Sequence, residues 1–147
     1  MPTLTCGGFD RPLIMDDPGT PLVEMLVLGP RERRVLPVRV LLLDATGAPV
    51  TDATMPPSAD GTRRAPVIRV VFRNDRGRVL VVDDLNGDGA PERNRAFRYD
   101  AASGRWIFNM PTAGLQPRGT YTIVVRSGDR NAYRVDRSSC SIAVRKN

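Results

Sequence analysis

Short runs of alternating apolar and polar residues, separated by turn-forming residues, make up most of this chain. The clearest run is Val35–Leu43, whose apolar positions alternate as Leu36, Val38, Val40 and Leu42. This period of two predicts a strand with one buried face. Pro37 lies on the other face and lacks an amide hydrogen, which favours a sheet edge or the start of a strand. No stretch of about ten residues or more has a helical period, so the pattern predicts an all-β fold.

Turn residues between the apolar runs predict three hairpins. The paired strands are Pro66–Arg73 with Arg78–Asp83, Phe97–Tyr99 with Trp106–Met110, and Tyr121–Ser127 with Asn131–Val135. The other expected strands are residues 3–9, Leu22–Leu28 (a strand or an edge segment) and Cys140–Arg145. About eight short strands at this spacing are typical of a β-sandwich or a β-barrel.

Length and composition fit one domain. A chain of 147 residues, of which 41% are hydrophobic, can build one core but not two ordinary domains. The 13 glycines and 13 prolines are dispersed, as expected for a β fold with many turns. We therefore predict a single domain over residues 1–147, with an acidic loop insertion at residues 83–94.

The formal net charge of +6 comes almost entirely from arginine, because Lys146 is the only lysine. A basic surface can bind nucleic acid or another polyanion. The alternative is that arginines simply occupy solvent-facing strand positions. They are spread from Arg11 to Arg145, with no basic helix and no interleaved aromatic residues. We favour this dispersed interpretation and expect no specific nucleic-acid partner.

Two cysteines, Cys6 and Cys140, lie near the two ends of the chain in or beside strand-like segments. One interpretation is a pair of buried free thiols, since cysteine packs as a small core residue. We favour a disulfide, because the first and last strands of a sandwich are commonly neighbours. A disulfide indicates an oxidising compartment, so we predict a secreted or cell-surface protein.

The start of the chain does not resemble a targeting signal. Met1–Cys6 lacks the charged and apolar regions of a signal peptide. We therefore expect that the mature chain begins after signal cleavage and that Met1 was added for expression. Leu22–Leu28 is too short to cross a membrane, so no transmembrane segment is predicted.

Several kinds of catalytic site are excluded by the residues present. The chain contains no histidine, which removes Ser-His and Cys-His nucleophilic sites and the usual zinc ligands. It also has no G-x-S-x-G elbow and no glycine-rich phosphate loop. An intramolecular isopeptide bond would need a buried lysine, and we expect Lys146 to lie at a frayed end. The protein is therefore predicted not to be an enzyme.

One loop has the spacing of a calcium site. Asp84, Asn86 and Asp88 alternate and Gly89 follows, as in the D-x-N-x-D-G start of a calcium loop. The predicted ligands are the acidic and amide side chains Asp83, Asp84, Asn86, Asp88 and Glu92. The twelfth position is Arg95, so this is not an EF-hand. A solvated Asn-Gly or Asp-Gly turn is the alternative. Calcium is the only cofactor predicted.

Several segments together resemble a bacterial immunoglobulin-like module. In chain order they are Cys6–Pro12, Arg34–Val40, Leu43–Ala53, Phe97–Asp100, Gly104–Asn109, Thr112–Leu115 and Gly119–Ile123. The resemblance covers about residues 7–145 and implies an immunoglobulin-like antiparallel β-sandwich. Such modules are accessory domains of secreted and surface proteins, and the family supplies no catalytic residues. The chain departs from the pattern at Arg39, where lysine is usual, and in its acidic loop.

The resembling segments contain two aromatic residues with expected structural roles. Trp106 would fill the space between the sheets, and Tyr121 stands where a tyrosine-corner hydrogen bond forms. The alternative is a carbohydrate platform built from Trp106, Phe108 and Tyr99. Because Trp106 and Phe108 share a face opposite Ile107, we favour the core.

Two functions follow from these observations. The first is a non-catalytic structural or adhesive module of a secreted bacterial protein, stabilised by calcium and contacting other domains of a larger surface protein. The alternative is a glycan- or polyanion-binding module that uses arginine side chains and loop aromatics.

Overall fold

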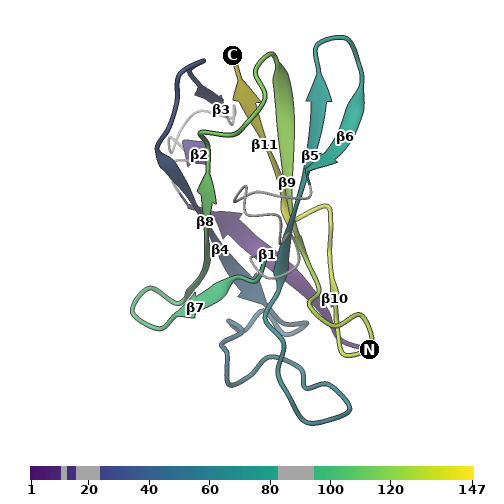
Figure 1. Cartoon of the computed structure of the whole chain (residues 1–147). Coiled ribbons are helices and arrows are strands. Elements are labelled where there is room, and N and C mark those ends of the chain that lie inside the picture. Colours follow the sequence, from purple (N-terminus) through teal and green to yellow (C-terminus); the bar gives the residue numbers. More distant parts are fainter. Residues whose placement is uncertain (11–12, 16–23, 83–94) are drawn as a thin grey trace.

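Two β-sheets packed against each other form the protein, and no helix occurs in the described residues. The computed structural model describes residues 1–10, 13–15, 24–82 and 95–147 (Figure 1). The five-stranded sheet has the order β10-β1-β4-β8-β7, with β1 (Thr3–Phe9), β4 (Val35–Leu43), β7 (Arg98–Asp100), β8 (Arg105–Pro111) and β10 (Arg134–Val135). The six-stranded sheet has the order β2-β3-β11-β9-β5-β6, with β2 (Ile14–Met15), β3 (Glu24–Leu28), β5 (Val67–Asn74), β6 (Val79–Val82), β9 (Gly119–Arg126) and β11 (Ser141–Lys146).

The strand order is that of an immunoglobulin fold. In that fold one sheet has the order A-B-E-D, and the other contains G-F-C, to which variable-type domains add C′. Here β1-β4-β8-β7 and β11-β9-β5-β6 have these orders when the strands are lettered along the chain with β2, β3 and β10 left out. The pairs β1 with β10 and β3 with β11 are parallel, and the other described strand pairs are antiparallel. The predicted immunoglobulin-like antiparallel sandwich is confirmed.

The core lies between the two sheets and is built by strand alternation. The four alternating residues of β4, namely Leu36, Val38, Val40 and Leu42, are all 0% exposed. Ile68, Val70 and Phe72 of β5 are buried opposite them in the same cluster. Burying such side chains stabilises the fold by roughly 1.5–3 kcal/mol each.

Pro37 is tolerated inside a central strand because the sheet is incomplete beside it. On one side Pro37 pairs with Asn109 of β8. On the other side β1 pairs only with Val40–Leu43, so no strand requires a hydrogen bond from position 37. Locally, Pro37 therefore has the edge-like environment that its missing amide hydrogen predicts.

Two of the three predicted hairpins are confirmed, and the third is wrong. The β5–β6 and β7–β8 pairs form as expected. β10, expected to pair with β9, instead runs parallel to Thr3 and Leu4 of β1. After Asp129 the chain makes a turn in which the amides of Ala132 and Tyr133 both donate to the Asp129 carbonyl. This turn buries Tyr133 completely and directs the following residues to the opposite sheet.

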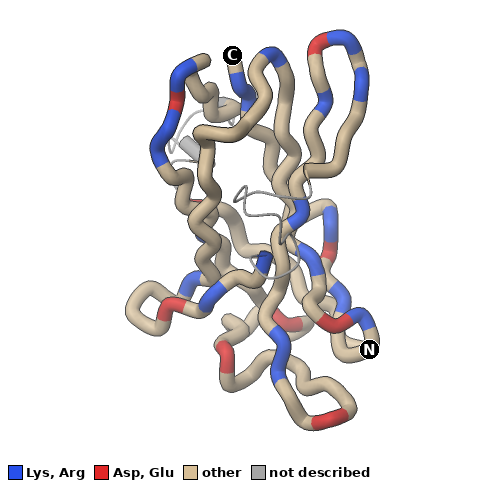
Figure 2. The backbone as a smooth tube through the Cα atoms, in the orientation of Figure 1, with Lys and Arg blue, Asp and Glu red and all other residues tan. Residues whose placement is uncertain are grey.

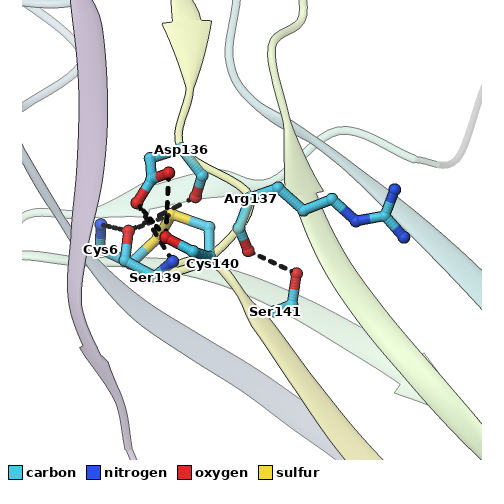
Figure 3. Close-up of a disulfide and its surroundings, with 7 residues drawn as sticks. Cys6, Asp136, Arg137, Ser139, Cys140 and Ser141 are labelled. Atoms are coloured by element: carbon cyan, nitrogen blue, oxygen red, sulfur yellow. Dashed lines mark hydrogen bonds between the residues drawn. A yellow bond between two sulfur atoms is a disulfide. The ribbon is translucent and has the colours of Figure 1, made fainter.

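The predicted disulfide between Cys6 and Cys140 is present, with the two Cα atoms 5.2 Å apart (Figure 3). The terminal strands are not paired neighbours as expected, however. β1 belongs to the five-stranded sheet and β11 to the six-stranded sheet. The bond therefore joins the sheets across the sandwich.

The expectation of a frayed C-terminal lysine is wrong. Lys146 is the last residue of β11 and only 2% exposed. Its Nζ donates a hydrogen bond to the Gly29 carbonyl at 2.8 Å. β11 lies between β3 and β9, and Lys146 is buried in this position.

Candidate anion-binding site

Arginines from two adjacent strands point away from the core at one end of the six-stranded sheet. In β5, Ile68 and Val70 face the core, so Arg69 between them faces outward. Arg126 is the last residue of β9, opposite Val67. Arg69 and Arg126 are therefore diagonal cross-strand neighbours, with Cα atoms about 7–8 Å apart.

The connection between β9 and β11, residues 127–140, brings three more arginines to the same place. Arg130, Arg134 and Arg137 are all exposed. The connection leaves the six-stranded sheet, adds β10 to the edge of the other sheet and returns at Cys140. Figure 2 shows basic positions along β10 and the turns beside it, close to the N-terminus.

Hydrogen bonds and the disulfide fix this β9–β11 connection. The amides of Arg134 and Asp136 donate to the carbonyls of Pro2 and Leu4. The Asp136 carboxylate accepts hydrogen bonds from Ser138 Oγ and the Ser139 amide, at 2.9 and 3.2 Å. In Figure 3 the Arg137 side chain extends away from the disulfide. The three arginines of this connection therefore belong to a segment whose backbone is held by hydrogen bonds and the disulfide.

A hollow of about 570 Å³ lies between the connection and the strand ends. Its charged lining residues are Arg69, Arg126, Arg130, Arg134 and Arg137, and apolar lining comes from Val71, Val124, Val125 and Val135. A smaller hollow of about 280 Å³ shares part of this wall and adds Arg95 and Val81. We call the two hollows together the arginine groove. Neither lining contains an aspartate or glutamate among the described residues.

The five arginines of the larger hollow form no ion pair within the described part of the chain. The ion pairs found there are Arg34–Glu32, Arg64–Asp60, Arg105–Asp10 and Arg145–Asp75, all outside the groove. Burial lowers the pKa of the Arg126 guanidinium, and the positive charges of Arg130, Arg69 and Arg137 lower it further. Arg126 therefore stands in a site of positive potential that favours a bound anion.

Comparisons of the chain with protein-family models, curated proteins and solved structures find no match. The described residues also contain no helix long and apolar enough to cross a membrane. The function must therefore be argued from the residues themselves.

The predicted calcium ligands Asp83, Asp84, Asn86, Asp88 and Glu92 lie outside the described residues. Among the residues that are described, no group of three or more acidic, cysteine or histidine side chains is placed to hold a metal ion. The calcium loop stays a prediction from sequence.

The structure places both predicted structural aromatics in the core. Trp106 is 2% exposed, and its Nε1 donates a hydrogen bond to the Val50 carbonyl at 3.0 Å. The Tyr121 hydroxyl donates to the Gln116 carbonyl at 3.0 Å, which is the geometry of a tyrosine corner. Burial raises the pKa of Tyr121 to about 12, so its hydroxyl stays protonated and able to donate.

The aromatic residues of the alternative carbohydrate platform, Trp106, Phe108 and Tyr99, are not exposed together. Trp106 and Phe108 face the core, and Tyr99 packs half-buried against the Trp106 ring, with ring centres 5.2 Å apart. Ile107 is also only 4% exposed, so both faces of this part of β8 are covered. These aromatic residues therefore do not form an exposed platform.

The groove is not visible in the sequence because its arginines are separated along the chain. Arg69 and Arg126 are 57 positions apart and meet only through the β5–β9 register. One signal was available: Arg126, Arg130, Arg134 and Arg137 recur at short spacing near a predicted strand end. The expected β9–β10 hairpin would have dispersed them along an exposed ribbon.

Proposed function

We infer that this protein is a non-catalytic binding module of a secreted bacterial protein, and that it binds an anionic surface polymer through the arginine groove. The observation that carries this proposal is the groove itself. Five arginines line its larger hollow, and none has an acidic partner in the described structure. Guanidinium groups bind carboxylate, phosphate and sulfate groups through paired charge-assisted hydrogen bonds.

The form of the groove favours a polymer over a small anion. The two hollows share Arg69, Arg126 and Arg130 in their linings and so lie side by side, and five arginines line the larger one. One small anion would neutralise only part of this charge. A chain bearing repeated negative groups could contact both hollows at once, and each contact would release counterions.

The secreted location rests on two supports. The first is the Cys6–Cys140 disulfide, because such bonds persist in oxidising compartments. The second is the resemblance to bacterial immunoglobulin-like accessory modules, with which the strand order of the sandwich agrees. Stabilisation by calcium at residues 83–92 belongs to the same proposal and rests on the D-x-N-x-D-G spacing alone.

The residues of the groove support binding without catalysis. Arginine stays protonated at physiological pH, and valine contributes only an apolar surface. The lining also contains Ser127 and Tyr133, whose hydroxyls are engaged within the protein: Ser127 Oγ accepts from the Asp129 amide, and the Tyr133 hydroxyl donates to the Arg64 carbonyl. The chain has no histidine, and the described groove lining has no carboxylate that could act as a general base. Such a lining can hold a charged group without activating a nucleophile.

Retention on an immobilised sulfated polysaccharide tests the proposal. The test protein carries glutamine at Arg130, Arg134 and Arg137, which are exposed groove positions. The matched control carries glutamine at Arg73, Arg76 and Arg78, which are exposed around the β5–β6 hairpin and outside both hollows. Both variants lose three charges, so non-specific attraction falls equally.

The expected result is retention of the wild type and the hairpin variant at about 0.15 M salt, where distant surface charges are screened. The groove variant should elute earlier. Equal loss of retention in the two variants would show that net charge alone accounts for binding and would overturn the proposal.

A further inference from the structure

The two hollows of the arginine groove meet at a wall that contains three arginines. Arg69, Arg126 and Arg130 line both hollows. Arg69 comes from β5, Arg126 from the end of β9, and Arg130 from the turn that follows. Three guanidinium groups from three different segments therefore gather at one place in the groove.

The nearest aspartate of the β9–β11 connection is already engaged elsewhere. The Asp129 carboxylate accepts hydrogen bonds from Ser58 Oγ and from the Asn131 amide. It forms no ion pair with an arginine in the described structure. Among the described residues, no acidic side chain forms an ion pair with these three guanidinium groups, and an anion seated among them would be attracted by all three.

We propose that Arg69, Arg126 and Arg130 form a subsite for one tetrahedral oxyanion, a phosphate or sulfate group carried by the polymer. This inference rests on the proposed function, because it names the chemical group that the groove selects. A phosphate or sulfate monoester presents three terminal oxygens that point in different directions, so each can accept from a different guanidinium. A carboxylate presents two coplanar oxygens and is matched by a single bidentate arginine.

The apolar surroundings of the subsite strengthen this selection. Val124 lies on the outward side of β9 but is only 3% exposed, and Val71 lines the same hollow. Guanidinium groups beside such a surface are less well hydrated, so an anion that engages all three gains more than it would in open solvent.

Three dextran derivatives of equal length and equal degree of substitution test the subsite: dextran sulfate, dextran phosphate and carboxymethyl dextran. The sulfate and carboxymethyl forms carry the same charge per group, which separates geometry from charge. Binding is measured by calorimetric titration at about 0.15 M salt. We expect the sulfate or the phosphate form to bind about tenfold or more tightly than the carboxymethyl form.

Variants locate this preference within the groove. Arg126→Gln should reduce it to about twofold or less, because one of three charge-assisted contacts is lost. Arg69→Gln, at a strand position on the outer face, gives a second reading if Arg126→Gln does not fold. Arg73→Gln, four residues beyond Arg69 along β5 and on the same face, should retain the preference.

The outcomes separate this inference from the proposed function. Preference for the sulfate form over the carboxymethyl form supports the subsite. Because a phosphate group carries more charge, preference for the phosphate form alone supports the subsite if Arg126→Gln abolishes it and Arg73→Gln retains it, and overturns it otherwise. Equal affinity for all three polymers overturns the subsite but leaves the groove as a general anion-binding site. Absence of binding to all three overturns both proposals.

Discussion

Removal of the Cys6–Cys140 disulfide should cause a large loss of stability. The bond joins residues 134 positions apart and cross-links the two sheets. In the chain-entropy model, a loop of this length stabilises the folded state by about 5 kcal/mol. A domain of this size changes its unfolding midpoint by about 2–4 °C per kcal/mol, so the expected decrease is about 10–20 °C.

The appropriate variant is Cys6→Ala with Cys140→Ala. Alanine is preferable to serine because Cys140 is 0% exposed, and serine would bury a hydroxyl group there. The assay is thermal unfolding followed by circular dichroism, for wild type and variant, each with and without a reducing agent. Reduction should lower the midpoint of the wild type and leave that of the double variant unchanged.

A decrease of less than about 3 °C would refute this reasoning, because it would correspond to about 1 kcal/mol. The inter-sheet bond would then add little to the contacts already made by the core. A midpoint that decreased equally with reducing agent in the double variant would show that the reagent acts elsewhere.

Three further predictions concern hydrogen bonding, pH and calcium. Tyr133→Phe should lower the free energy of unfolding, measured with denaturant, by about 2 kcal/mol, and Tyr121→Phe by about 1 kcal/mol. The buried Tyr133 hydroxyl accepts from the Gly128 amide and donates to the Arg64 carbonyl, whereas the Tyr121 hydroxyl makes one hydrogen bond, to the Gln116 carbonyl; equal losses would contradict this. Hydrogen bonds from Thr and Ser side chains lower the pKa of Asp44 and Asp136 below 3.8. The ionised carboxylates therefore stabilise the folded state above pH 3.8, and this stabilisation is lost as the pH falls through the lowered pKa. With no histidine to titrate, the unfolding midpoint should change little from about pH 5 to 8 and fall below about pH 4, and a step near pH 6.5 would contradict it. Calcium at about 1 mM should raise the midpoint relative to chelator in the wild type but not in Asp84→Asn/Asp88→Asn, and an unchanged wild-type midpoint would rule out the calcium loop.

Strand positions could be predicted from the sequence where alternation is strong and turns are short. The boundaries of Val35–Leu43 agree with those of β4, and the Asn74–Gly77 turn joins β5 to β6 as expected. Gly77 has a φ of +87°, a conformation that favours glycine and marks the turn in the sequence. Strand alternation and turn residues depend only on neighbouring positions in the chain, so these features can be predicted from short stretches of sequence.

Features that depend on distant partners could not be predicted in this way. β10 pairs with β1 through two residues at each strand, too few to leave a periodic signal. Lys146 looks like a free chain end in the sequence but is buried between β3 and β9. The arginine groove likewise forms only when the β5–β9 register and the β9–β11 connection bring separate arginines together.

The binding site can be located most directly by nuclear magnetic resonance during titration with a short sulfated oligosaccharide. We expect the largest chemical-shift changes at Arg69, Arg126 and residues 127–137, and the arginine side-chain Nε–H signals of the groove should shift with them. Changes centred on the β5–β6 hairpin, or small changes spread over all exposed arginines, would contradict the assignment of the groove as the binding site.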